Sequence, residues 1–279
     1  MGPLFKSSII LFGAKRKMLQ ELGGVETLVV GSSHGDFGFD PGYCPGSFNL
    51  CCRSQDLKHS FHLYRRLCET MPGIRNLVVF YSVFSPGNIM ELSPAEREIC
   101  PALNEIFGLD ITYQDPHLAE LAALIKGQLD EVSISLDGRA GFFPSTEKDF
   151  IPSAYGAERR AADHLKLNRS DEANVDLGQI LSLADALGHK VIIVLPPVRE
   201  DYRQACSLPV PDLFASLFAM LEVFGRKLPS LDVEVLNAFD DTAYKDEFFG
   251  DFDHLLPTGQ GVGLLTSSIQ RAIDAGTSA

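Results

Sequence analysis

The sequence predicts an α/β protein, a flavodoxin-like three-layer α/β/α sandwich with a central parallel sheet. Short runs of almost wholly apolar residues are bounded by turn residues, as expected of strands that are buried on both faces. Between these runs lie segments with apolar residues three or four apart, which is typical of amphipathic helices. Strands that alternate with helices in this way form parallel sheets covered by helices on both faces.

Four apolar runs are predicted to be buried strands, and a weaker fifth candidate lies at residues 47–50. In chain order the four are Thr27–Val30, Leu77–Tyr81, Lys190–Leu195 and Val233–Leu236. In an open parallel sheet, the functional residues gather where the strands end, at their carboxyl ends. We therefore expect function in the segments that follow the strands: Gly31–His34, Tyr81–Ser85, Pro196–Arg199 and the residues after Leu236.

Four helices are predicted around these strands: Gln55–Thr70, Asp171–Leu187, Pro211–Leu228 and Gly259–Ala275. Ser54 is the expected N-cap of the first helix, and Gly188 is the expected C-cap of the second. Residues 90–167 are less regular, with short helical patterns interrupted by Gly and Pro. The chain of 279 residues is predicted to form a single domain (1–279), with the 90–167 range as an insertion or a cap over the site.

The composition limits the class of partner. A net charge of −13 argues against nucleic acid, because proteins that bind it usually present a basic face. The one dense basic cluster, Lys15–Lys17, is predicted to be a solvated helix face. The apolar run Ser8–Gly13 is too short for a membrane span and lacks the features of an export signal. The six cysteines show neither a disulfide framework nor a metal-finger spacing, so we expect a reduced, cytoplasmic protein.

The first candidate catalytic segment is Gly-Ser-Ser-His-Gly at residues 31–35, directly after the first strand. A nucleophilic serine needs a sharp, uncrowded turn that exposes its oxygen and lends a backbone N–H to an oxyanion. Ser33 is the candidate nucleophile, and His34 beside it either contacts the substrate or packs within the turn. Two alternatives remain: a simple connecting turn, or a phosphate-binding loop at a helix N-terminus. The segment lacks the spacing of the glycine-rich nucleotide fingerprints.

The second candidate segment is Asp-x-x-His at residues 251–254, just before the last predicted helix. A histidine that acts as a general base needs an acceptor, normally a carboxylate, to orient its second ring nitrogen. An aspartate three positions earlier reaches that nitrogen on a tight turn. His254 is therefore the candidate base and Asp251 its orienting acid. The alternative is an exposed acidic loop in which Asp251 or Asp253 only caps the last helix.

Together, Gly-x-Ser after the first strand and Asp-x-x-His before the last helix resemble the motifs of the SGNH/GDSL hydrolase family. The resemblance covers nearly the whole chain in order, but only the two ends match sharply. Gly31 and Ser33 match the first block, in which Ser32 replaces an aspartate. Asp251 and His254 match the last block.

The resemblance extends to one branch of that family. Gly-Ser-Ser in the first block looks like the branch tied to the acylation of cell-envelope glycans. Phe48–Leu50, followed by Ser54–Leu57 and a helix, resembles SGNH-like proteins of bacterial surface-polysaccharide clusters. The resemblance implies a serine-dependent acyl-ester hydrolase or O-acyltransferase that acts on an acylated carbohydrate or a related small ester. Hydrolysis would require no cofactor, whereas transfer would need an acyl donor.

Two blocks of the family are missing. Cys51–Gln55 contains no oxyanion glycine, and Tyr81–Phe84 replaces the family's Gly-x-Asn-Asp. The candidate oxyanion or substrate-binding groups are therefore Arg53, Ser54, Gln55, Ser82 and His34. For Arg53 the alternative is a salt bridge at the start of a helix. For the whole protein the alternative is a catalytically weak or inactive SGNH-like protein that binds a glycan or a partner. No metal site is predicted, because the spaced pair His59 and His62 lacks a third ligand.

Overall fold

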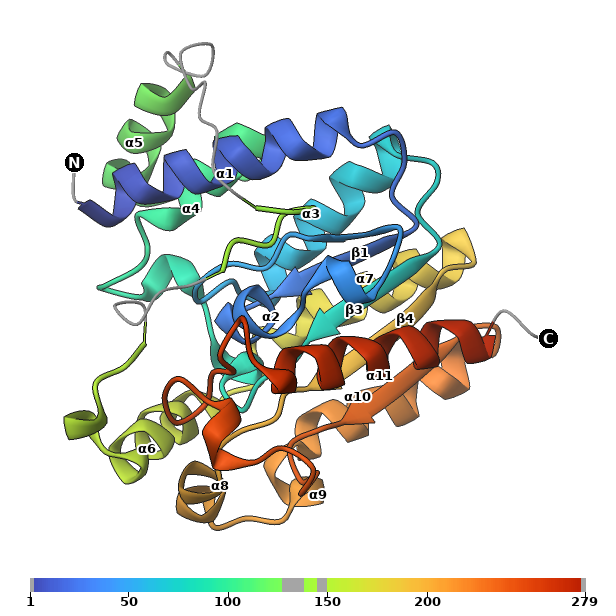
Figure 1. Cartoon of the computed structure of the whole chain (residues 1–279). Coiled ribbons are helices and arrows are strands. Elements are labelled where there is room, and N and C mark those ends of the chain that lie inside the picture. Colours follow the sequence, from blue (N-terminus) through green and yellow to red (C-terminus); the bar gives the residue numbers. More distant parts are fainter. Residues whose placement is uncertain (1–2, 127–137, 145–149, 277–279) are drawn as a thin grey trace.

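The computed structural model describes residues 3–126, 138–144 and 150–276. At its centre is a sheet of five parallel strands in the order β2-β1-β3-β4-β5 (Figure 1). This order, with helices on both faces of the sheet, confirms the predicted flavodoxin-like three-layer sandwich. The strands are β1 (Thr27–Gly31), β2 (Ser47–Asn49), β3 (Asn76–Phe80), β4 (Lys190–Leu195) and β5 (Val233–Asn237).

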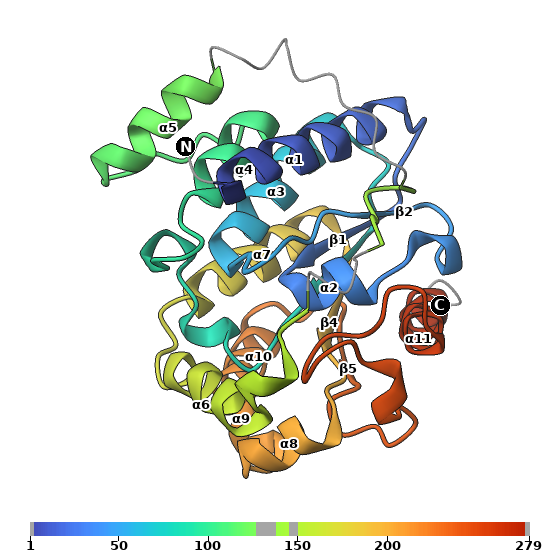
Figure 2. The same ribbon diagram turned by 60° about the vertical axis from the view of Figure 1, so that its left-hand side comes forward.

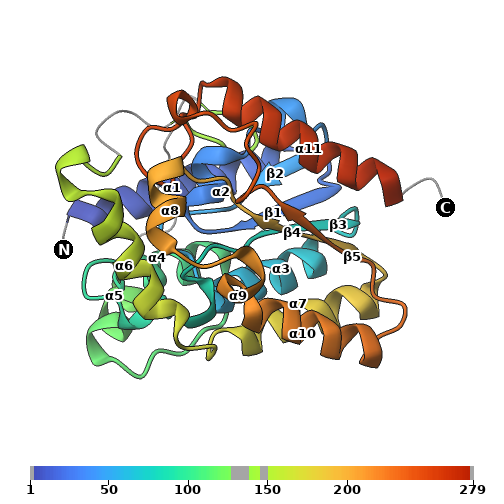
Figure 3. The same ribbon diagram turned by 90° about the horizontal axis from the view of Figure 1, so that it is seen from below.

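Helices form the two outer layers, as Figure 3 shows. Successive residues of a strand point to opposite faces of the sheet. Val29 and Ile192 therefore pack with the apolar residues of α11, while Leu28 and Val191 pack with those of α3 and α7. One layer contains α2 (Ser33–Gly38) and α11 (Gln260–Gly276), and the other contains α3 (Leu57–Thr70), α7 (Asn174–Leu187) and α10 (Ala215–Lys227).

The remaining helices pack on this sandwich. Helix α1 (Pro3–Glu21) contacts α4 (Ile99–Phe107), which in turn contacts α5 (Pro116–Lys126). Helix α6 (Ala157–Asn168) lies against α8 (Glu200–Cys206), as Figure 2 shows. Within the described ranges, no helix combines the length and the apolar character needed to cross a membrane. Shorter elements are α9 (Val210–Leu213), η1 (Pro41–Tyr43), η2 (Ser85–Gly87), η3 (Met90–Leu92), η6 (Ser153–Tyr155) and η7 (Asp246–Phe248).

Most differences from the predicted elements concern helix ends. Helix α3 begins at Leu57, and its N-cap is Asp56 rather than Ser54, because the Asp56 carboxylate accepts a hydrogen bond from His59 N–H. The helix predicted at 211–228 is interrupted at Phe214 and forms α9 and α10. In the irregular range 90–167, the described residues form η3, α4, α5, η6 and α6. Residues 127–137 and 145–149 of that range lie outside the described residues.

The prediction of a solvated basic cluster is wrong at Lys15. Its side chain is fully buried, and Nζ donates to Asp36 Oδ1 at 2.8 Å and to the Cys51 carbonyl at 2.6 Å. Both partners accept hydrogen bonds, so the buried ammonium is compensated. Asp36 belongs to α2, the helix that begins at Ser33. The ion pair therefore ties the N-terminal helix to the helix that presents the candidate nucleophile.

Candidate active site

Ser33 lies at the carboxyl end of β1, where the chain turns sharply into α2. Gly31 ends the strand with φ of +133°, and a Cβ atom at this position would come within 2.8 Å of Phe80. Only glycine fits this close backbone approach. Ser32 is extended and caps α2, so Ser33 is the first helical residue. The first N–H groups of a helix have no partner within it, which leaves the Ser33 N–H available to a ligand.

Ser33, His254 and Asp251 form one hydrogen-bonded chain. His254 Nε2 lies 2.8 Å from Ser33 Oγ, and His254 Nδ1 lies 2.9 Å from Asp251 Oδ2. These distances are within the range required for proton transfer. All three side chains are buried, with Ser33 retaining 8% of its exposure. The structure thus brings together the three residues that the two end motifs single out.

Asp251 is oriented by the backbone around it. Its carboxylate accepts hydrogen bonds from the N–H groups of His254, Asp253 and Ile151, at 2.9, 3.1 and 3.0 Å. Burial alone would raise the pKa of Asp251, but the hydrogen bond and the charge of His254 outweigh it and hold this pKa below its usual value. An ionised Asp251 accepts the Nδ1 proton of His254. That tautomer leaves Nε2 free to accept the proton of the serine.

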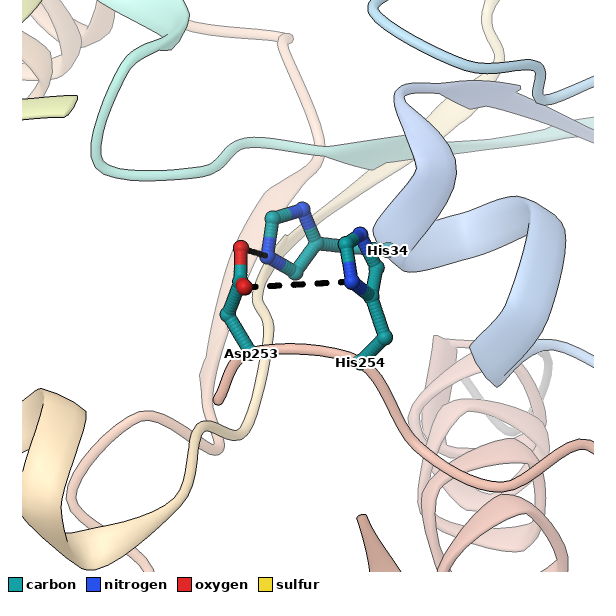
Figure 4. A group of neighbouring side chains, drawn as sticks. All are labelled: His34, Asp253 and His254. Atoms are coloured by element: carbon teal, nitrogen blue, oxygen red, sulfur yellow. Dashed lines mark ion pairs between the residues drawn. The ribbon is translucent and has the colours of Figure 1, made fainter. Parts of the chain in front are cut away.

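A second polar layer lies behind His254, as Figure 4 shows for His34 and Asp253. His34 Nε2 lies 3.3 Å from Asp253 Oδ2, and Asp253 Oδ1 lies 3.8 Å from His254 Nδ1. Arg160 from α6 binds the same carboxylate through Nε at 3.1 Å and Nη2 at 3.1 Å. Burial alone would raise the pKa of Asp253, but the charges of His254 and Arg160 hold it well below its usual value. Asp253 is therefore a buried anion shared by three neighbours.

His34, Asp253 and His254 also form the one group among the described residues whose potential metal-ligand atoms lie within 4.8 Å of one another. Both ring nitrogens of His34 and of His254 already have partners in the chain, with a carboxylate or a hydroxyl on each. Hydrogen bonding therefore accounts for the arrangement of these side chains. His59 and His62, the spaced pair on α3, belong to no such group in the described ranges.

A pocket of about 780 Å³ opens onto Ser33 and His254. This volume is in the range of small-molecule sites. Its walls combine apolar side chains with a few polar groups, among them Asn88 and Arg160. The apolar walls are Phe37, Phe84, Ile89, Leu92, Pro94, Ile151 and Leu167, and the other polar or charged residues are Arg53, Ser54, Ser93, Glu96, Asp163, His164, Ser170 and Glu172.

The predicted oxyanion or substrate-binding residues fall into two groups. Arg53 and Ser54 line the pocket, whereas Gln55, Ser82 and His34 lie behind it. The Gln55 amide lies between the Leu50 carbonyl, the Gly31 N–H and Ser60 Oγ, at 2.9 to 3.1 Å. It therefore braces the end of β1. Arg53 is half exposed, and its Nε lies 3.9 Å from a carboxylate oxygen of Glu96.

Ser82 and His34 support the nucleophile turn from behind. Ser82 Oγ lies 2.8 Å from His34 Nδ1 and 3.2 Å from Ser32 Oγ. Both hydroxyls are almost fully buried. His34 is thereby held between these hydroxyls on one side and Asp253 on the other, which is the packing role that the sequence left open beside substrate contact.

Asn88 is a pocket residue that the sequence did not reveal. It follows η2, the turn after β3, and is 7% exposed. Its amide nitrogen donates to the Ser54 carbonyl at 2.8 Å. The one feature of the sequence that could have indicated Asn88 is its position after strand β3. It lies eight residues beyond Phe80, however, and so outside the Tyr81–Phe84 block where the family pattern has its asparagine. Chain distance alone does not show that the η2 turn returns Asn88 to the pocket.

Comparisons with known proteins give no independent indication of function. The chain matches no protein-family model, and no curated protein matches it. The chemistry of the site is therefore argued from its geometry and from the resemblance of its motifs.

The buried histidines predict that the protein loses stability in mild acid. Burial lowers the pKa of His34, and burial together with Arg160 lowers the pKa of His164 well below its usual value. Below about pH 6.5 the unfolded chain takes up protons that the folded chain does not, so the free energy of unfolding falls as the pH falls. Each histidine costs about 1.4 kcal/mol per pH unit between its two pKa values.

Urea unfolding at pH 8, 6.5, 5.5 and 4.5 measures this loss. Replacing His164 with glutamine is expected to reduce the slope below pH 6.5. At pH 8 His164 is neutral in both the folded and the unfolded chain. The free energy of unfolding of the same variant at pH 8 therefore measures only the loss of packing. A free energy of unfolding that stays level from pH 6.5 to pH 4.5 would contradict the prediction.

Proposed function

We propose that this protein is a serine-dependent acyl-ester hydrolase or O-acyltransferase of the SGNH type. The observation that carries the proposal is the hydrogen-bonded chain from Ser33 Oγ through His254 to Asp251, at 2.8 and 2.9 Å. A nucleophile, a base and an orienting acid in this order are the requirement for acyl transfer through a covalent serine intermediate. The resemblance of the two end motifs supports the same chemistry.

In the proposed reaction Ser33 Oγ attacks the ester carbonyl, and His254 Nε2 takes the hydroxyl proton. Asp251 stabilises the imidazolium that forms. The tetrahedral intermediate then collapses, the C–O bond to the alcohol breaks, and His254 returns the proton to the leaving alcohol. Water, or a second alcohol in a transferase, attacks the resulting acyl-serine with His254 again acting as the base.

The oxyanion is proposed to bind the N–H groups of Ser33 and Ser54. Ser54 has φ of +54°, a strained conformation for a residue with a side chain, and the structure gives its N–H no hydrogen-bond partner among the described residues. Such strain is found where a site constrains the backbone. Asn88 holds the Ser54 carbonyl with one amide proton. Its second amide proton is then available as a further donor.

The charges of the pocket favour an uncharged ester. Each arginine of the lining has a carboxylate neighbour, Glu96 for Arg53 and Asp253 for Arg160. Among the described residues, an anionic substrate would therefore meet no uncompensated positive charge, and Asp251 and Asp253 would oppose it. An acylated carbohydrate or a related small neutral ester fits these conditions, with its apolar part against the phenylalanine and aliphatic walls. A reduced, cytoplasmic setting is part of the proposal, and it is supported by six cysteines that form no disulfide.

Covalent trapping tests the proposal directly. A small alkyl fluorophosphonate reacts with activated serines. A bond forms between the serine Oγ and phosphorus, and the P–F bond breaks with release of fluoride. We expect one modification per chain, located by mass spectrometry on the peptide that contains Ser33, and none in the Ser33→Ala variant. Modification of another serine, or none at reagent concentrations that modify known serine esterases, would contradict the proposal.

The rival function is that of a catalytically weak or inactive SGNH-like protein that binds a glycan or a partner. It is favoured by the absence of the family's Gly-x-Asn-Asp block after β3, where Tyr81–Phe84 stands instead. This protein would keep the pocket but show neither trapping nor turnover.

A further inference from the structure

Arg160 and Asp253 form a buried ion pair next to the candidate base. Two nitrogens of the guanidinium contact the carboxylate, Nε at 3.1 Å from Oδ1 and Nη2 at 3.1 Å from Oδ2. The Asp253 side chain is fully buried and that of Arg160 is 20% exposed. The pair joins two elements that are distant in the chain, helix α6 and the loop before α11. Arg160 also lines the pocket.

In the part of the chain that the structure describes, the charged and titratable groups around His254 come from three elements. Its own loop supplies Asp251 at 2.9 Å and Asp253 at 3.8 Å from Nδ1. Helix α2 supplies His34, whose ring centre lies 4.9 Å from that of His254. Helix α6 supplies Arg160 and His164, the latter with Nδ1 4.0 Å from the Asp253 carboxylate.

Only some of these groups carry charge near neutral pH. Burial lowers the pKa of both His34 and His164, so the two rings are neutral there. Arg199, on the segment after β4, lies over the Phe252 ring and pairs with Asp201. Among the described residues, the charged groups that these contacts place around His254 are therefore Asp251 and the Arg160–Asp253 pair.

We propose that Arg160 and Asp253 are a positioning pair through which helix α6 sets the proton affinity of His254. The Asp253 carboxylate stabilises the imidazolium form of His254, and the Arg160 guanidinium, across that carboxylate, opposes it. The role of His254 as a catalytic base rests on the proposed function. The effect of the pair on the protonation of the His254 ring does not. At 3.8 Å, even with the dielectric constant of water, one unit charge changes a protonation equilibrium by about sixfold.

The two members of the pair predict shifts of opposite sign. Asp253→Asn removes the negative charge without changing the shape of the side chain, so the ring titration and the acid limb of kcat/KM are expected to move to lower pH. Arg160→Gln removes the positive charge, so both are expected to move to higher pH. The double variant is expected to lie between the two. The measurement is an NMR titration of the His254 ring, assigned with His254→Gln, together with the acid limb of kcat/KM for an aryl acetate.

The controls separate electrostatics from packing. Arg160→Lys keeps the positive charge, so the ring titration is expected to lie close to that of the wild type. Arg226→Gln makes the same charge change at an exposed ion pair on α10, remote from the site, and is expected to leave the titration unchanged. If Arg160→Gln fails to fold, the isosteric Asp253→Asn decides the case alone, because only a downward shift agrees with the proposal.

Shifts of the same sign in both single variants, or no shift in Asp253→Asn, would overturn the inference. A pair that serves only to hold α6 in place would lower the thermal stability and kcat in both variants without separating their titrations. The ring titration needs no turnover, so the inference can fail while Ser33 proves to be the nucleophile. It can equally stand if no ester is hydrolysed.

Discussion

Ser33→Ala is expected to lower kcat/KM for 4-nitrophenyl acetate by at least about 10⁴-fold, because it removes the atom that forms the acyl-enzyme. The remaining activity would come from the binding pocket and the oxyanion donors, which act without the nucleophile. His254 and Asp251 would keep their hydrogen bonds to each other, so little of the folded structure should change. Initial rates against a buffer blank, with circular dichroism to verify folding, measure the effect.

Ser32→Ala is the matched control, since it makes the same change one residue earlier. The Ser32 hydroxyl bonds His34 and Ser82 rather than His254. This hydroxyl does not contact the reacting atoms, so activity is expected to stay within about tenfold of the wild-type value, and the loss of its hydrogen bonds is expected to appear in stability. Equal losses in the two variants would leave the nucleophile unassigned. Turnover that is low in the wild type and unchanged in Ser33→Ala would favour the inactive, binding function.

Asn88→Ala is expected to lower kcat by about 10²- to 10³-fold with little change in KM, the usual cost of losing one oxyanion donor. The amide both fixes the Ser54 carbonyl and has a second proton to donate. An oxyanion interaction is strongest in the transition state, which is why kcat falls rather than KM rising. Steady-state kinetics with a series of aryl acetates show how the loss of activity is divided between kcat and KM.

The Ser54→Gly variant distinguishes the Ser54 N–H from the Ser54 hydroxyl as the oxyanion donor. Glycine adopts φ of +54° without strain and keeps the backbone N–H, while the hydroxyl is lost. If the N–H is the donor, kcat is expected to stay within about threefold of the wild-type value. A loss as large as that of Asn88→Ala would transfer the donor role to the Ser54 hydroxyl. Near-normal kinetics in both variants would mean that the oxyanion is bound elsewhere.

The loop before α11 contains two acids, and their positions account for different contacts. Asp251, three residues before His254, folds back on a tight turn and reaches Nδ1 at 2.9 Å. Asp253 directly precedes His254, and its carboxylate points toward α2 and α6, where His34 and Arg160 bind it. One acid therefore orients the ring, and the other joins the ring to the helices around the pocket.

The sequence by itself determined the layered fold and the two ends of the candidate site. The buried strands β1, β3 and β4 leave a local signal, because a strand covered on both faces must be apolar along its length. The prediction of a buried strand at Val233–Leu236 is wrong in its burial, since β5 is only half-buried at the edge of the sheet. All five strands lie within one residue of the predicted positions. The Asp251–His254 pair is also local, since three residues are enough to close it. Ser33 was a candidate because a turn of small residues directly after a strand can present a hydroxyl at the carboxyl end of the sheet, where functional residues gather.

Tertiary structure alone decided which distant polar groups meet. The sequence predicted a solvated face at Lys15, whereas the packing of α1 buries this side chain against Asp36. Arg160 and Asp253 are 93 residues apart, and Asn88 and Ser54 are 34 apart. The type of a polar residue does not identify its partner, because that partner depends on how whole helices and loops pack. The candidate nucleophile and its candidate base were therefore predictable from the chain, whereas the groups that surround them follow from the packing of α1, α6 and the turn after β3.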